Sequence, residues 1–97
     1  MQFEWDEKKN KSSIKSHGVS FEEAAEVFDD PFCISMLDKR FNYYEERWIS
    51  LGSTIKGKII VTGYAYYLAE NSEERIRIIT ARKATRKERE QYEEVKK

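Results

Sequence analysis

The sequence has few of the residues that build disulfides, metal centres and rigid turns. It contains one cysteine, one histidine and one proline among 97 residues. Cys33 therefore cannot form an internal disulfide, and with His17 as the only imidazole it cannot assemble a zinc site. Cys33 lies in the apolar run PFCISML, which favours a buried, inert thiol. Without a glycine-rich phosphate loop, a G-x-S-x-G motif or a metal-ligand cluster, the sequence predicts no metal and no cofactor.

Long apolar runs are also missing. No segment approaches the roughly 20 apolar residues that cross a membrane, and the N-terminus, MQFEWDEKKNK, turns to charge without the apolar core of a secretory signal. We therefore expect a cytoplasmic protein with no membrane contact. With 39% apolar residues, the chain is long enough for one core, so residues 1–97 are expected to form a single domain.

The first third of the chain carries helix signals. Asp6 can cap a helix that runs to His17, where Gly18 supplies a left-handed stop. Ser20 can open a second helix, because a glutamate follows it at the spacing of a capping box. This helix should end at Asp30, directly before the proline. The sequence therefore predicts two consecutive helices joined by a tight turn.

Strand signals dominate the rest of the chain. Residues 3–5 could begin a short strand, and β-branched and aromatic residues then predict four longer ones. We place these at 32–38, 46–52, 58–67 and 75–82. Their short connections favour antiparallel order, and a second capping box starting at Thr85 predicts a final helix. The predicted fold class is α+β, with two N-terminal helices, a four-stranded antiparallel sheet and a C-terminal helix.

A basic segment is the feature that points to function. Residues 75–89 hold seven Lys or Arg and a single acid, although 18 bases and 18 acids cancel over the whole chain. Strand alternation places Arg77 opposite the isoleucines that should form the core. Arg82 has the wrong parity to join Arg77 unless a bulge or the end of the strand redirects it. The alternatives are a phosphate-binding surface and a simple solvated face.

The start of the final helix is also basic. Arg86 and Lys87 stand where the helix dipole favours acids, so local stability does not explain them. Bases and free backbone N–H groups at a helix start can bind an anion such as a nucleic-acid phosphate. A merely solvated helix is the other interpretation. Only Tyr92 and Val95 provide apolar contacts, so this helix should dock weakly.

Proton-transfer groups are scarce. His17 could act as a general acid or base, or it could contact the last carbonyls of its helix. Glu46 could transfer a proton or form a surface ion pair. Arginines suit metal-independent RNA cleavage, because they stay protonated and bind phosphate in a bidentate way. Tyr43 and Tyr44, in a loop, could stack an unpaired base.

Several ordered blocks along nearly the whole chain resemble the BrnT toxin family. They are the W-D-x-x-K opening at Trp5, the HGVSF-x-EA block at 17–24, the Asp-Pro exit at 30–31, the ERWISLG strand at 46–52 and the basic run at 77–89. The resemblance implies a ribonuclease toxin of a bacterial type II toxin–antitoxin pair, with a RelE-like fold, that inhibits translation by cleaving RNA. It also implies a BrnA-like DNA-binding antitoxin as partner. The toxin would contact operator DNA only through this antitoxin.

The resemblance also suggests roles for individual residues. The expected catalytic residues are His17, Glu46, Arg77 and Arg82. The expected RNA contacts are Lys9, Arg47, Arg86 and Tyr92. The neutral net charge departs from the excess of bases that helps a free ribonuclease, so the acidic stretch at 22–30 should lie away from the substrate site. Two alternatives stay open: an inactive module that binds RNA or antitoxin, and a subunit that only docks an acidic protein.

Overall fold

The computed structural model describes residues 1–40 and 46–97. Its helices are α1 (Glu7–His17), α2 (Phe21–Glu26) and α3 (Arg86–Lys96), and a short 3-10 turn, η1 (Val27–Asp29), continues α2. Among the described residues, no helix is long and apolar enough to cross a membrane.

The predicted helix starts and the stop of the first helix at Gly18 are confirmed. The Asp6 side chain accepts hydrogen bonds from the first turn of α1, and Gly18 ends this helix with φ at 68°. Ser20 and Thr85 both form complete capping boxes, at the starts of α2 and α3. The second helix is shorter than expected, because the chain tightens into η1 before Asp30.

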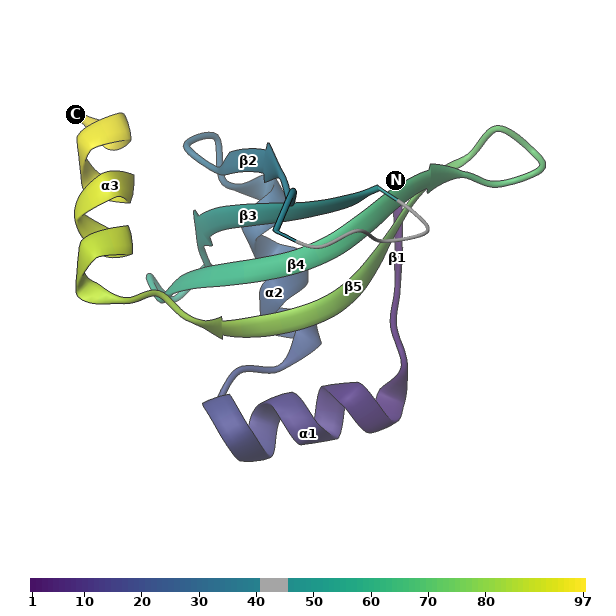
Figure 1. Ribbon diagram of the computed structural model, residues 1–97, viewed down its shortest axis with the longest axis horizontal. Helices are drawn as coiled ribbons and strands as arrows, with labels where there is room; N and C mark the ends of the chain where they lie inside the picture. The colour runs from purple at the N-terminus through teal and green to yellow at the C-terminus, as the bar shows by residue number, and fades with distance from the viewer. Residues whose placement is uncertain (41–45) are drawn as a thin grey trace.

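Five strands form one sheet (Figure 1). They are β1 (Gln2–Glu4), β2 (Ile34–Leu37), β3 (Arg47–Ser53), β4 (Ile59–Leu68) and β5 (Glu74–Lys83). The order across the sheet is β1-β5-β4-β3-β2, with β1 and β2 at the two edges. The pairs β2–β3, β3–β4 and β4–β5 are antiparallel, whereas β1 runs parallel to β5.

The predicted four-stranded antiparallel sheet of a RelE-like α+β fold is therefore wrong. The sheet has five strands and is mixed, because the chain start adds β1 beside β5. This strand covers three residues, too few to show an alternating pattern in the sequence. Its partner lies about 70 residues further along the chain, with Phe3 beside Ile76. Short connections, which led to the antiparallel prediction, carry no information on such a distant pairing.

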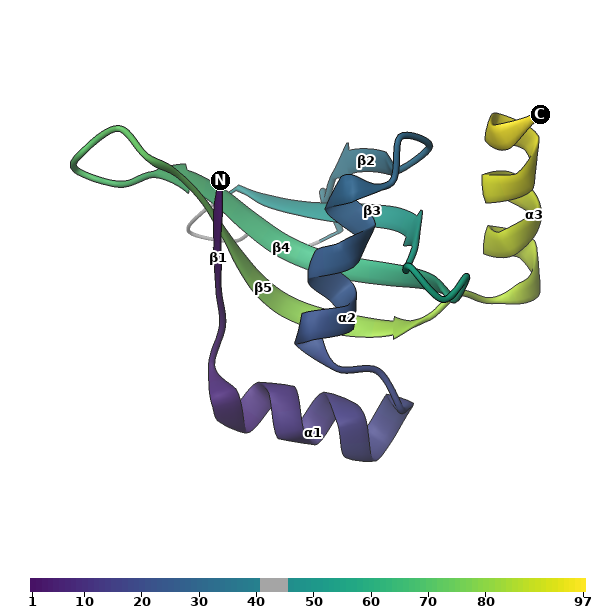
Figure 2. The same cartoon turned by 180° about the vertical axis from the view of Figure 1, so that it is seen from behind.

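One face of the sheet is covered by α2, as Figure 2 shows. Phe21, Ala24 and Val27 from α2 and η1 pack with Ile60 and Ile78 of the central strands, and all five are at most 1% exposed. We call this side the α2 face. It holds the larger apolar core, which agrees with the alternation of buried isoleucines expected in the last strand.

The opposite face carries a smaller apolar cluster near α3. Tyr92 of α3, 1% exposed, packs there with Leu51, Val61 and Ala84. The helix stands at one end of the sheet (Figure 1). Most of its remaining residues are exposed, so α3 docks through few contacts, as its thin apolar content predicts.

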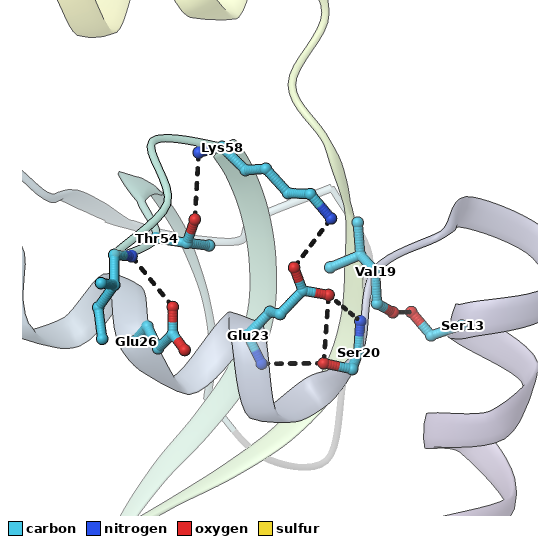
Figure 3. A network of polar contacts seen from close by, with 8 residues as sticks. Ser13, Val19, Ser20, Glu23, Glu26, Thr54 and Lys58 are labelled. Atoms are coloured by element: carbon cyan, nitrogen blue, oxygen red, sulfur yellow. Dashed lines mark hydrogen bonds and ion pairs between the residues drawn. The ribbon is translucent and has the colours of Figure 1, made fainter.

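A polar network fixes α2 against the turn between β3 and β4 (Figure 3). The Glu23 carboxylate accepts from the Ser20 backbone N–H at 3.0 Å and from Lys58 Nζ at 2.9 Å. The hydrogen bond from Lys58, followed by that from the Ser20 backbone, holds the pKa of Glu23 below its ordinary value. Glu26 accepts from the backbone N–H of Ile55 at 3.0 Å. Acids of the stretch 22–30 are thus engaged on the α2 side of the molecule.

Candidate active site

A bulge in β5 determines which arginines share a face. Along β4, Gly63 pairs with Thr80 but its neighbour Tyr64 pairs with Ile78. Ile79 is therefore the extra residue of a β-bulge, and the alternation of side chains restarts after it. The alternation of residue types along β5 does not predict where this bulge lies.

The bulge brings Arg82 to the same face as Arg77. Before it, Arg77 pairs with Ala65 and points away from the α2 face. After it, Ala81 turns into the core of the α2 face, at 2% exposed, and Arg82 pairs with Val61 on the opposite face. The predicted parity of these two residues is thus reversed.

Arg47 completes a row of arginines on this face. Ala65 of β4 pairs with Arg47 of β3 on one side and with Arg77 of β5 on the other. Two strand spacings place the Cα atoms of these arginines about 10 Å apart, with only a methyl side chain between them. We call Arg47, Arg77 and Arg82 the arginine row. All three are partly buried.

Helix α1 lies along the edge of β5, where buried polar groups hold it. Ser13, 7% exposed, places its hydroxyl 2.7 Å from the carbonyl oxygen of Val19 and 3.1 Å from that of Ala81. Asn10, 2% exposed, accepts a hydrogen bond from the Phe21 backbone N–H at 2.8 Å. These bonds fix how α1 presents its other side chains to the sheet.

A pocket of about 410 Å³ lies between α1 and the opposite face of the sheet. Its floor comes from the strands: Ile49, Val61, Gly63, Ile79 and Thr80. One wall is a face of α1: Lys9, Ser12, Ser13, Ser16 and His17. The remaining side chains are Phe21, Arg40, Ala81 and Arg82. The pocket therefore brings together three of the predicted site residues, Lys9, His17 and Arg82, from the two ends of the chain.

The charged side chains that line this pocket are basic, and two of them, Arg40 and Arg82, form ion pairs with Asp38 and Glu88. Its lining contains Lys9, Arg40, Arg82 and the imidazole of His17, and no carboxylate is among the lining residues. Arg82 keeps 42% of its side chain exposed although it binds Glu88. Hydrogen bonding and charge from Arg82 lower the pKa of Glu88 to about 2. The same hydrogen bond raises the pKa of Arg82.

The other predicted site residues lie outside the pocket lining. Arg77 and Arg47 belong to the arginine row, and Glu46 is exposed directly before β3. Arg86 is exposed in the first turn of α3, 3.4 Å from Glu90. Tyr92 is buried, and its hydroxyl donates to Asp30 Oδ2 at 2.5 Å.

Tyr43 and Tyr44, which were expected to stack an unpaired base, lie outside the described residues. Among the residues that the structure describes, no group of three or more His, Cys, Asp or Glu could hold a metal ion.

Sequence reasoning missed much of the pocket. Ser12, Ser13 and Ser16 share one face of α1 with the predicted Lys9, and this hydroxyl-rich stripe is a signal that could have been found. Arg40 precedes the third strand without any motif around it. The apolar floor, Ile49, Val61 and Ile79, is indistinguishable in sequence from ordinary core.

Over the described residues, three helices and a five-stranded mixed sheet carry a pocket lined by basic side chains and an arginine row, which together suit a polyanionic ligand such as RNA. Residues 5–88 match the family model described as "Ribonuclease toxin, BrnT, of type II toxin-antitoxin system". The chain belongs to this BrnT family, as the sequence resemblance predicted. The family assignment implies an RNA substrate and an antitoxin partner.

A solved structure agrees with the fold. The chain is similar to the crystal structure of the Brucella abortus ribonuclease toxin, BrnT, with a TM-score of 0.60 and 22% sequence identity. The match covers 89% of this chain and 99% of that one. At this identity the likeness shows the shared fold. A comparison with curated protein sequences gave no match.

Proposed function

We propose that this protein is an active endoribonuclease that cleaves RNA without a metal ion and thereby inhibits translation in the cytoplasm. A BrnA-like DNA-binding antitoxin would neutralise it and would provide its only link to operator DNA. The observation that carries the proposal is the pocket, which brings Lys9 and His17 of α1 beside Arg82 of β5. The family assignment supports the choice of RNA as substrate.

The chemistry assigned to this site is transesterification within the RNA. The 2′-oxygen of one nucleotide attacks the adjacent phosphorus, and the bond from phosphorus to the 5′-oxygen of the next nucleotide breaks. One group must take the 2′-hydroxyl proton, and another must supply a proton to the departing 5′-oxygen. His17 lines the pocket and is the stronger candidate for one transfer. Glu46 is exposed outside the lining and is the second candidate.

Arginines stabilise the negative charge that grows on the phosphate. Arg82 lines the pocket, and Arg77 and Arg47 continue along the same face, so one RNA strand could cross the sheet with its phosphates on the arginine row. Lys9 and Arg86 would add phosphate contacts at the two ends. We assign no RNA contact to Tyr92, because its buried hydroxyl is engaged by Asp30.

The test uses purified protein and a structured RNA substrate in buffer that contains EDTA. Wild-type protein should cut the RNA, and Arg77→Ala and Arg82→Ala should each lower the rate by about 100-fold or more while circular dichroism stays unchanged. Lys56→Ala is the matched control, because Lys56 is an exposed base in the turn before β4, outside the pocket. Full activity of both arginine variants would overturn the site assignment. A wild-type protein that binds RNA but never cuts it would instead identify an inactive binding module.

A further inference from the structure

We propose that the pocket between α1 and β5 is a nucleobase subsite, which accepts one unpaired base of single-stranded RNA beside the phosphate-binding arginine row. The proposal rests on the proposed function for the choice of RNA as ligand. It adds that the protein holds its substrate by a base as well as by phosphates.

The apolar floor of the pocket argues for a base. Ile49, Val61 and Ile79 present aliphatic side chains where a phosphate site would need donors. A volume of about 410 Å³ falls in the range of roughly 300–1,000 Å³ typical of small-molecule sites. A planar aromatic ring gains from this apolar contact, whereas a hydrated phosphate loses its water without compensation.

Glycine keeps the floor open. A Cβ atom placed on Gly63 would lie 2.4 Å from Thr80 Oγ1, which is closer than such atoms approach each other. Any larger residue at this position would have to displace Thr80 and would project into the pocket. The bulge at Ile79 places Thr80 across from Gly63, so the shape of the floor follows from the same irregularity that aligns the arginine row.

Hydroxyls line the α1 wall and the floor. Ser12, Ser16 and Thr80 each carry a group that can donate or accept a hydrogen bond. The edge of a base offers both donors and acceptors, so these hydroxyls can meet it whichever base enters. Inorganic phosphate can also accept from these hydroxyls, but it has no apolar face to place on the floor.

Basic side chains stand where the backbone of a bound nucleotide would run. Lys9 and His17 belong to the α1 wall, and Arg82 belongs to β5. Arg40, which pairs with Asp38, follows β2. A base inserted between these groups leaves its phosphates at the rim, in contact with them. Guanidinium planes can also stack on a base, which gives Arg40 and Arg82 a second mode of contact.

The test is binding by NMR, with the four nucleoside 5′-monophosphates compared with ribose 5-phosphate. These ligands share the sugar and the phosphate and differ by the base. At least one nucleotide should bind about tenfold tighter than ribose 5-phosphate. The amide signals of Ser12, Ser16, Gly63 and Ile79 should shift with the nucleotide. Equal affinity for all five ligands, or shifts confined to other parts of the chain, would overturn the proposal.

Two variants fill the pocket from its wall. Ser16→Leu and Ser12→Leu each place a large side chain at an exposed position of α1, and leucine favours a helix. Both should reduce the ratio of nucleotide affinity to ribose 5-phosphate affinity to about one. Lys11→Leu adds the same side chain to an exposed position of α1 outside the pocket and should keep the wild-type ratio. A ratio unchanged in both serine variants would contradict the assignment of the base to this pocket.

This experiment does not depend on catalysis. If the protein never cuts RNA but the nucleotide preference is found, the proposed function fails and the subsite stands. If the protein cuts RNA but binds ribose 5-phosphate as well as every nucleotide, the subsite fails and the proposed function stands.

Discussion

The Arg82 guanidinium donates two parallel hydrogen bonds to the Glu88 carboxylate, at 2.8 Å from Nη1 to Oε1 and 3.0 Å from Nη2 to Oε2. Glu88 Oε1 also accepts from the backbone N–H of Thr85 at 2.8 Å, which closes the capping box of α3. One carboxylate therefore caps the last helix and orients an arginine of the pocket. The position of α3 and the direction of Arg82 are coupled through it.

The first prediction concerns Glu88→Gln, which removes the charge but can keep the capping box. The folded-state pKa of Glu88 is lowered to about 2, so the ion pair stabilises the fold above the unfolded pKa of about 4.3 and its contribution is lost as pH falls toward 2. The pair is partly exposed and screened by water, so the variant should lose on the order of 1 kcal/mol at pH 7. Urea unfolding at pH 7 and at pH 2.5 measures this. A difference between variant and wild type that does not shrink at the lower pH would contradict it.

The second prediction concerns Tyr92→Phe at the docking point of α3. Burial and the Asp30 carboxylate raise the pKa of Tyr92, whose hydroxyl donates to Asp30. Burial raises the pKa of Asp30 too, but hydrogen bonds, including that from Tyr92, outweigh it and hold the pKa below its ordinary value. Loss of the hydroxyl should lower the free energy of unfolding by about 1–2 kcal/mol.

The matched control for this variant is Tyr66→Phe. Tyr66 donates to Glu74 at 2.8 Å on the exposed part of β4, where water can replace the bond. Its free energy of unfolding should change by less than about 0.5 kcal/mol. Thermal denaturation measures both variants. Equal losses of unfolding free energy would mean that the buried Tyr92–Asp30 bond stabilises the fold no more than the exposed Tyr66–Glu74 bond.

Local signals predicted the helices well. Each helix start has a side chain that caps it within the same turn, so a few neighbouring residues contain the whole explanation. The parallel pairing of β1 with β5 could not be predicted, because it depends on packing between residues such as Phe3 and Phe28, whose rings lie 5.4 Å apart. The three residues of β1 carry no pattern that predicts β5 as the partner strand.

The site was only half predictable for a similar reason. Lys9, His17 and Arg82 could be singled out by residue type and by family resemblance, and the pocket unites them. Their geometry depends on the bulge at Ile79, which changes the face of every later residue in β5. A bulge arises from the fit between two strands, so one strand read alone predicts the wrong parity for Arg82.

The third prediction concerns Asn10→Ala, which should loosen α1. The Asn10 side chain accepts from Phe21 N and donates to Glu7 and Glu22, at 2.8–3.0 Å, and the residue is 2% exposed. Its removal leaves the buried Phe21 N–H without its acceptor, which should cost about 1–3 kcal/mol. Lys11→Ala, an exposed neighbour on the same helix, should change the free energy of unfolding by less than about 0.5 kcal/mol. Chemical denaturation compares the two, and hydrogen exchange should rise along α1 only in the Asn10 variant.

The last prediction tests the floor of the pocket by a double-mutant cycle on Gly63 and Thr80. Gly63→Ala puts a methyl group against Thr80 Oγ1, 2.4 Å from the new Cβ, so the variant should lose about 1–2 kcal/mol of unfolding free energy. With Thr80→Ala the nearest remaining atom is Thr80 Cβ at 3.7 Å, an ordinary contact. The double variant should therefore be more stable than the sum of the single effects implies, by about 1 kcal/mol. Additive effects in urea unfolding would mean that the destabilisation by Gly63→Ala does not come from contact with Thr80. The pocket floor would then not require glycine at this position.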